Sequence, residues 1–300
     1  MYEPFRSRNA VSPPRFAFAT AQAAMLLIAW SACAADRRDT SPSTIALPAV
    51  EVSTLSDPVE KSYRRIVSGM DLFERRHGLA PAAALRFKLL PRSRTTDMEG
   101  IALSVVGETV DIPVPVAHDH TFAFERSRRA LEEDAVVVPN RKARSMTWRT
   151  DIRTPGLPAD TRRLGDLRLE CLVGVEAALV SDIPSSLLGD VAGLIADRGY
   201  CNQRMPHYLF FAERPLWTVA LVYGNRREIL SVDDMYAGIT RSPMTADELQ
   251  HCDCEVLLDR TYYAPLGDPA WPDDTLIRFE YMDEGVTAIA SPAGATERPR

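Results

Sequence analysis

Six short apolar segments between Ala83 and Thr154 constrain the fold more than any other feature of the sequence. They are ALRFKLL, IALSVV, TVDIPVPV, TFAFE, AVVVP and MTWRTDIRT. Each is rich in β-branched or aromatic residues, and turn residues or clusters of charge separate it from the next. Short strands at this spacing pair with their neighbours along the chain. The pattern therefore predicts an antiparallel β-sandwich.

An amphipathic segment before these strands predicts a helix over residues 57–78. Apolar residues recur at three- and four-residue spacing, at Val59, Tyr63, Ile66, Met70 and Phe73. Asp57 is suited to cap this helix, and Gly78 is suited to end it. His77 falls in the last turn, where a cation favours the helix dipole, so we interpret it as a helix residue and not a catalytic one.

A Pro- and Gly-rich stretch, TPGLPADTRRLGD at residues 154–166, predicts a domain boundary. The helix and the sandwich form the predicted first domain, 57–158, and a smaller α+β domain follows at 159–284. In that second domain LRLEC alternates like a strand, and Ser186–Arg198 has the pattern of a second amphipathic helix. Further strands are predicted at HYLFFAE, WTVALVYG, REILSV, CEVLLDRTYY and TLIRFEYM. The predicted fold class is therefore α+β.

Two stretches resemble known proteins. Residues 83–154, with a short polar hairpin before TFAFE, resemble the transthyretin-like sandwich of carboxypeptidase regulatory-like domains. RRLGDLRLEC is similar to a stretch of uncharacterised exported proteins of proteobacteria. The first resemblance implies a β-sandwich, and the second implies export. Neither implies an activity.

The first 35 residues have the order of an export signal. A basic start is followed by an uncharged apolar run, Phe16–Trp30, and then by small residues. Ala32-Cys33-Ala34 suits cleavage after Ala34. Ser31-Ala32-Cys33 instead resembles the end of a bacterial lipobox, which would lipidate Cys33 and tether the chain to a membrane. Both endings stay open. Residues 36–56 are predicted to be a flexible linker, and 285–300 a disordered tail.

The charge balance excludes one class of partner. The chain carries a formal net charge of −6 at pH 7, and a nucleic-acid-binding protein needs a concentrated basic face. We therefore expect no nucleic-acid partner. Arg is far commoner than Lys, and Ala and Pro are frequent, which is typical of a GC-rich bacterial genome.

The segment HCDCEV holds His251, Cys252 and Cys254, the densest group of reactive side chains. In a strand, Cys252 and Cys254 would share a face with their α-carbons ~6.6 Å apart, which disfavours a bond between them. The predicted arrangement is two disulfides, each joining one of this pair to Cys171 or Cys201. The alternatives are one disulfide with two buried thiols, or a metal or redox site at His251, Cys252 and Cys254.

Other candidate residues have simpler interpretations. His118 and His120 flank Asp119, and we expect a turn there in preference to a metal site. Asp233-Asp234 and Asp273-Asp274 are expected to be solvated loop residues, and His207 has no obvious partner. Three basic residues, Arg162, Arg163 and Arg168, could form an anion-binding edge.

Catalytic motifs with a known mechanism are absent from the sequence, including Gly-x-Ser-x-Gly, His-Glu-x-x-His and a phosphate-binding Gly-rich loop. We therefore predict an exported, non-enzymatic binding or interaction module without a cofactor. Its partner would be a protein, peptide or glycan of the envelope, held at an open strand edge or at aromatic residues such as Tyr262, Tyr263 and Trp271. The alternatives are an envelope hydrolase with a site at the domain boundary, and a metal or redox protein.

Overall fold

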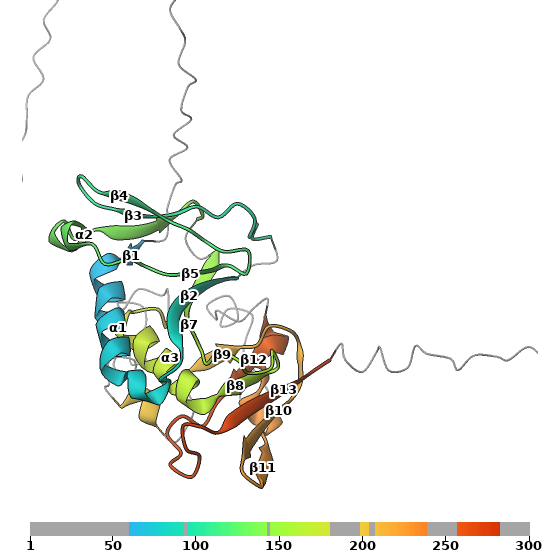
Figure 1. Cartoon of the computed structure of the whole chain (residues 1–300). Coiled ribbons are helices and arrows are strands. Elements are labelled where there is room, and N and C mark those ends of the chain that lie inside the picture. The colour runs from blue at the N-terminus through green and yellow to red at the C-terminus, as the bar shows by residue number, and fades with distance from the viewer. Residues whose placement is uncertain are drawn as a thin grey trace, which may run out of the picture. The chain divides into compact units, whose positions relative to one another are not determined.

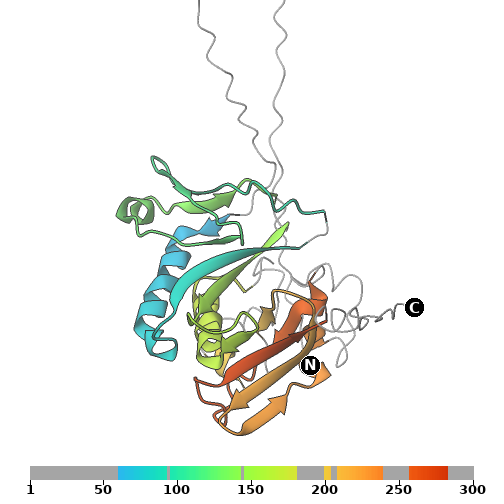
Figure 2. The same ribbon diagram turned by 45° about the vertical axis from the view of Figure 1, so that its right-hand side comes forward.

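A computed structural model describes residues 60–92, 95–142, 145–180, 199–203, 208–238 and 257–282. All of them belong to one compact unit, Ser53–Arg300. This unit combines helices with several antiparallel sheets (Figures 1 and 2). The prediction of a mixed α+β fold is therefore confirmed at this level.

The first helix, α1, runs over Tyr63–Arg76. It begins later than predicted because β1 (Lys61–Ser62) pairs with β6 (Val136–Pro139), and the Ser62 side chain then caps the helix by accepting from the Arg65 N–H at 3.4 Å. The predicted cap, Asp57, lies outside the described residues. His77 is the C-cap residue, as expected for the end of the helix, and its Nε2 lies 3.0 Å from the Ala83 carbonyl oxygen.

All six segments between Ala83 and Thr154 form strands. Besides β6, they are β2 (Ala84–Pro91), β3 (Leu103–Val106), β4 (Asp111–Val114), β5 (Thr121–Phe122) and β7 (Met146–Arg153). They belong to two antiparallel sheets with the strand orders β1-β6-β3-β4 and β5-β2-β7. The longest pairing joins β2 to β7, from Ala84 opposite Arg153 to Pro91 opposite Met146. A short helix, α2 (Arg128–Glu132), precedes β6.

Side chains of both sheets and of α1 join one hydrophobic core. Its largest members are aromatic: Tyr63 from α1, Phe87 from β2, Phe122 from β5, Trp148 from β7, and Phe124, which follows β5. Phe122 meets Trp148 edge-on, with ring centroids 5.8 Å apart. The alternation of residues in β2, β3, β4 and β6 thus corresponds to a more buried and a less buried face, whereas β7 is buried on both faces.

Replacing Tyr63 with Phe is expected to lower the free energy of unfolding by about 1–3 kcal/mol. The Tyr63 hydroxyl donates to the Glu125 carbonyl at 2.6 Å and accepts from the Ser127 N–H at 2.8 Å, so Phe would keep the ring but leave both groups unpaired. Urea unfolding followed by circular dichroism measures the change. Tyr223, which is well exposed, gives the matched control Tyr223→Phe. Equal losses in both variants would contradict the prediction.

The LRLEC segment is helical, so its prediction as a strand was wrong. It belongs to α3 (Leu164–Glu176), which follows β8 (Thr161–Arg163). The apparent alternation arose because α3 is buried on nearly all sides, including its acidic residues Asp166 and Glu170. A helix that is buried all round shows no polar face, and the 3.6-residue period is then hidden. Close packing of α3 on α1 needs glycine: a Cβ on Gly69 would lie 2.9 Å from the Ala177 Cβ.

The remaining strands form two further sheets. In one of them, β9 (Leu209–Phe211) pairs with β12 (Thr261–Tyr263). The other has the strand order β11-β10-β13-β8, with β10 at Leu216–Tyr223, β11 at Arg226–Ile229 and β13 at Leu276–Tyr281. The strands predicted at HYLFFAE, WTVALVYG, REILSV and TLIRFEYM are therefore confirmed. The predicted strand CEVLLDRTYY is wrong at Leu258–Arg260, which form a 3₁₀ turn, and right at its last three residues. Three more 3₁₀ turns lie at Tyr200–Asn202, Val232–Asp234 and Tyr236–Gly238.

One disulfide joins Cys171 of α3 to Cys201. The expectation of a disulfide is confirmed, but the predicted pairing of each of these cysteines with Cys252 or Cys254 is wrong. That pairing followed from the even number of cysteines and from the exclusion of a bond between Cys252 and Cys254, whereas α3 directs the Cys171 side chain toward the 3₁₀ turn that holds Cys201. His251, Cys252 and Cys254 lie outside the described residues.

Several predicted segments cannot be compared with the structure. The export signal at 1–35, the linker at 36–56, the helix at 186–198 and the tail at 285–300 all lie outside the described residues. The predicted division after Pro158 stays a prediction, and it falls inside the compact unit Ser53–Arg300. No helix in the described part of the chain is long and apolar enough to cross a membrane.

Candidate functional site

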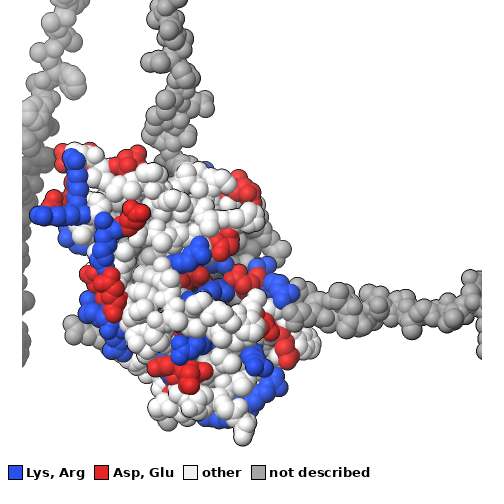
Figure 3. Space-filling model, viewed as in Figure 1, with Lys and Arg blue, Asp and Glu red and all other residues white. Residues whose placement is uncertain are grey.

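A small, partly enclosed cavity of about 40 Å³ lies where β2, β7, α3 and the segment around β9 meet. Charged side chains dominate its lining. The basic ones are Lys88, Arg149, Arg153 and Arg162, and the acidic ones are Asp151, Glu170 and Glu213. Tyr208, Phe210 and Phe211 contribute aromatic surface. On the face shown in Figure 3, basic and acidic side chains lie next to one another near the middle.

The alternation of β7 places its charged residues together. Arg149, Asp151 and Arg153 are two residues apart and therefore point to the same side of the strand. In the register of the sheet, Lys88 of β2 lies opposite Arg149. One strand face thus supplies three of the seven charges, and its partner strand supplies a fourth.

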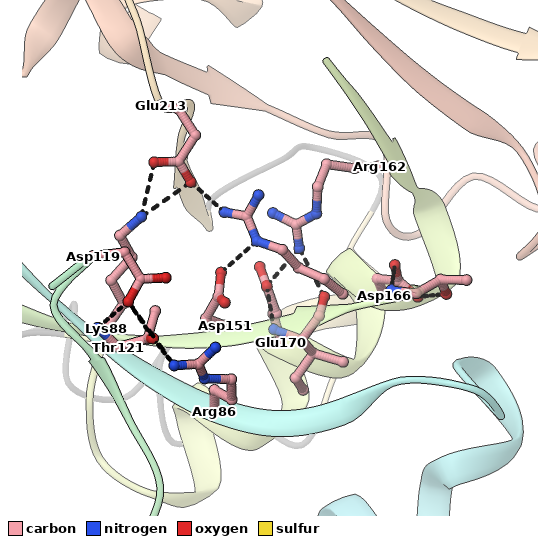
Figure 4. Close-up of polar contacts among 12 residues, drawn as sticks. Arg86, Lys88, Asp119, Thr121, Asp151, Arg162, Asp166, Glu170 and Glu213 are labelled. Atoms are coloured by element: carbon pink, nitrogen blue, oxygen red, sulfur yellow. Dashed lines mark hydrogen bonds and ion pairs between the residues drawn. The ribbon is translucent and has the colours of Figure 1, made fainter. Parts of the chain in front are cut away.

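Arg162 and Glu170 complete the free edge of β7. Among the described strands, β7 pairs only with β2, so the other side of its backbone needs partners. The Ile152 N–H donates to Glu170 Oε1 at 2.7 Å, and the Ile152 carbonyl accepts from Arg162 Nη2 at 2.8 Å. Arg162 Nη2 also donates to Glu170 Oε1 at 2.5 Å (Figure 4). The ion pair therefore takes the place that a neighbouring strand would occupy.

A second set of ion pairs lies nearer the solvent. Lys88 Nζ contacts the two carboxylate oxygens of Glu213 at 3.0 and 2.8 Å, and Arg153 Nη2 reaches Glu213 Oε1 at 2.5 Å. Arg153 Nε donates to Asp151 Oδ1 at 2.7 Å (Figure 4). Burial acts to raise the pKa of Glu213, but Lys88 and Arg153 outweigh it and hold this pKa below its usual value.

Glu170 differs from Glu213 in the direction of its pKa shift. Burial raises the pKa of its carboxyl group from 4.5 to about 7, although Arg162 and the bond from Ile152 oppose the shift. The residue is 4 % exposed, so water does little to stabilise the ionised form. Glu170 can therefore exchange a proton near neutral pH, which marks the cavity as a candidate functional site.

Arg149 lies against the aromatic lining. Its guanidinium carbon is 4.9 Å from the centroid of the Phe211 ring and 5.9 Å from that of Tyr208. Burial raises the pKa of Tyr208, against the effect of Arg149, so the phenol stays protonated. Among the described residues, the lining has four basic and three acidic side chains.

The prediction that Arg162, Arg163 and Arg168 form an anion-binding edge is wrong, because these side chains do not form an exposed basic surface. Arg162 is buried with Glu170. Arg168 donates to Asp273 at 2.5 Å and to three backbone carbonyls, at Leu266, Asp268 and Trp271. Arg163 Nη1 lies 3.9 Å from Asp166 Oδ1. Each guanidinium therefore ties segments of this chain together, and only Arg162 lines the cavity.

Asp119 is a turn residue, as predicted. Its Oδ1 accepts from the Thr121 N–H at 3.1 Å and from the Thr121 hydroxyl at 2.6 Å, and His120 has a positive φ of 61°. The turn does not close a hairpin, because β4 pairs with β3 whereas β5 pairs with β2. Within the described residues, no three His, Cys, Asp or Glu side chains are grouped so that they could hold a metal ion.

Two of the three aromatic residues expected at a binding surface are buried. Tyr262 and Trp271 belong to the second hydrophobic core, and the Arg226 guanidinium covers Trp271 at 3.6 Å from a ring centroid. Trp217 is instead the most exposed aromatic side chain of the described residues, at 66 %. Of the carboxylate pairs, Asp273 is held by Arg168, and Asp233-Asp234 lie in a 3₁₀ turn that Ser231 caps. His207 lies outside the described residues.

Glu170, Arg149 and Asp151 were not singled out from the sequence. A signal for them does exist: WRTDIR carries charge at every second position of a strand between apolar segments, and LRLEC carries a single acid among aliphatic residues. Charges at positions that a fold must bury need partners, so such residues predict buried ion pairs.

Comparison with protein-family models finds no match. Comparison with curated proteins and with solved structures finds no significant match either. The function of this chain is therefore inferred from the geometry and charge of the cavity.

Proposed function

We propose that this chain is an exported, non-enzymatic binding module of the bacterial envelope, and that the cavity between β2, β7, α3 and β9 is its ligand site. The observation that carries the proposal is a partly enclosed cavity whose described lining combines seven charged side chains with three aromatic ones. Arg149, Arg162, Asp151 and Glu170 are buried there, and burying a charge is costly unless a partner or a ligand compensates it. A concave site with a few convergent polar groups and one perturbed acid is typical of ligand binding.

The lining argues against the alternative of an envelope hydrolase. None of the described residues that line the cavity is Ser, Cys or His. The Thr150 hydroxyl donates to the Glu170 backbone carbonyl at 2.8 Å, so its proton is directed away from any side-chain base. A Ser or Cys nucleophile beside a His base is therefore absent from the described part of this lining.

Two further elements of the proposal have support from the sequence. The order of charges and small residues in 1–35 supports export, with cleavage after Ala34 or lipidation of Cys33. The shared core of the two sheets supports a β-sandwich over residues 83–154, of the kind that the transthyretin-like resemblance implies. A ligand presented by a protein, peptide or glycan of the envelope suits such a module.

Replacing Arg149 with Met is expected to weaken ligand binding at least about tenfold, because Met keeps much of the apolar stem but removes the charge. The full chain, purified from its own envelope, would be screened by thermal unfolding against carboxylates, sugars, amines and short peptides. Hits would then be titrated into both proteins.

Arg128→Met is the matched control, since the Arg128 side chain is 93 % exposed and is not part of the lining. Ligands that bind the wild type and Arg149→Met equally well would contradict the proposed site. The absence of any hit would contradict the proposed function itself.

A further inference from the structure

We infer that the free edge of β11 is an interaction surface for a second copy of this chain, and that the two β11 strands pair antiparallel about a twofold axis. β11 is the last strand of the sheet β11-β10-β13-β8, and all four of its residues are exposed. Figure 1 shows it at the lower end of the described structure. None of its residues lines the proposed ligand cavity, so the two surfaces are separate.

Two residues of β11 direct their backbone groups away from the sheet. The Leu230 N–H donates to the Val219 carbonyl of β10 at 2.8 Å, so the backbone of Leu230 faces β10. In an antiparallel pair this direction alternates from residue to residue, so the N–H and C=O groups of Arg227 and Ile229 point to the free edge. Such a row of groups is a template for another strand.

The other edge strands of comparable length are protected. Among the described strands of four or more residues, β4 and β7 also lie at sheet edges. In β4, the Gly107 N–H donates to the Val110 carbonyl at 2.8 Å, and the same alternation directs Pro113 outward, where it has no N–H to offer. In β7, Arg162 and Glu170 occupy the free edge. β11 contains no proline, and the exposure of all its residues shows that its edge is not covered in this way.

One register satisfies the outward groups of both copies. Arg227 lies opposite the partner's Ile229, and Ile229 lies opposite the partner's Arg227. Each of these two pairs exchanges both of its backbone hydrogen bonds. Arg227 and Ile229 project to the same face of β11, so the faces of the two sheets stay continuous across the twofold axis. The interface is isologous, as is usual for a dimer with twofold symmetry.

The side chains of β11 are complementary to those of a second β11 in this register. Arg226 Nη2 donates to Glu228 Oε2 at 3.0 Å within one chain, and both side chains lie on the same strand face. The two Glu228 side chains oppose each other across the axis, and each has the partner's Arg226 diagonally across from it. Every carboxylate therefore has an arginine of both chains nearby. On the other face, Ile229, which is 54 % exposed, packs on the aliphatic stem of the partner's Arg227.

The interface is small. A strand of four residues buries less area than the about 1,200–2,000 Å² of a standard protein–protein interface. We therefore expect a reversible monomer–dimer equilibrium with a dissociation constant in the micromolar range.

Analytical ultracentrifugation of the full chain over a range of concentrations measures this equilibrium. Arg227→Pro removes an outward N–H, and Pro is tolerated in an edge strand where the N–H faces away from the neighbouring strand. This variant is expected to weaken the dimer at least about tenfold. Ile229→Arg places an arginine opposite the partner's Arg227, and we expect a similar loss because like charges that oppose each other are destabilising.

Two further variants give the control and the register. Val106→Arg is the matched control, because Val106 is 36 % exposed in β3, which is paired on both sides, and it should leave the dimer unchanged. Ile229→Glu places a carboxylate opposite the partner's Arg227, so it is expected to associate at least as tightly as the wild type. Ile229→Arg alters no backbone group, so it tests the surface even if Arg227→Pro folds poorly.

Each result supports or overturns the second copy at β11. A wild-type chain that stays monomeric would overturn it and leave the edge to an extended peptide of another protein. A dimer that neither Arg227→Pro nor Ile229→Arg weakens would lie elsewhere on the surface and also overturn it. Equal weakening by Ile229→Arg and Ile229→Glu would overturn the register. Because no cavity ligand is present in these measurements, their failure would leave the proposed function standing.

Discussion

Replacing Arg162 with Met is expected to lower the free energy of unfolding at neutral pH by about 3–5 kcal/mol. The reason is that Glu170 loses the cation that it pairs with. Glu170 is buried, and Arg162 is the cation that contacts it at 2.5 Å. Met also cannot donate to the Ile152 carbonyl, so the free edge of β7 loses a hydrogen bond. Denaturant unfolding of the wild type and of Arg162→Met measures the difference.

The double variant Arg162→Met/Glu170→Leu separates the penalty of an unpaired charge from the contribution of the pair. Well-packed apolar residues often replace a buried ion pair with little loss of stability, so this variant is expected to be closer to the wild type than Arg162→Met is. Arg227→Met is the control for loss of an Arg, because the Arg227 side chain is 55 % exposed at the surface. A double variant that is less stable than Arg162→Met would contradict this account.

The strands were predictable because their pattern is local. Burial alternates from residue to residue in β2, β3, β4 and β6, as expected for strands with one face toward a core. The order of the strands within the sheets was harder to predict from the sequence. No local pattern shows that β5 pairs with β2 and not with β4. The sequence of the turn at Asp119 is compatible both with a hairpin and with a connection between two sheets.

Helix α3 and the disulfide show where local patterns failed. A helix buried on all sides gives no amphipathic signal, and the short stretch LRLEC fits a strand equally well. The disulfide was predicted by excluding a bond between Cys252 and Cys254, and no local pattern shows that Cys171 and Cys201 lie side by side. The cavity was missed for a related reason. Its charges come from elements that are distant in the sequence, and a single one of them has no distinctive motif.

Raising the pH from about 5 to about 8 is expected to lower the free energy of unfolding by about 2–3 kcal/mol through Glu170 alone. The pKa of this group is about 7 in the folded chain, against 4.5 as its ordinary value. The folded state therefore binds the proton more tightly than the unfolded state between these two values. Its stabilising effect is complete below about pH 4.5 and is lost as the pH rises through 7.

Other shifted carboxyl groups act outside this range. The pKa values of Asp119, Glu133 and Glu213 are lowered in the fold, that of Glu133 to about 2, so the stability that these groups contribute is lost as the pH falls below about 4.5. Stability should therefore pass through a maximum near about pH 5, and its decline at higher pH should be caused by Glu170.

Urea unfolding across this range tests the assignment to Glu170. Glu170→Gln should flatten the decline, whereas Glu132→Gln, at an exposed position in α2, should not. If Glu170→Gln kept the wild-type slope, another group would have to be the one that binds the proton, and the Arg162–Glu170 ion pair would stay ionised throughout.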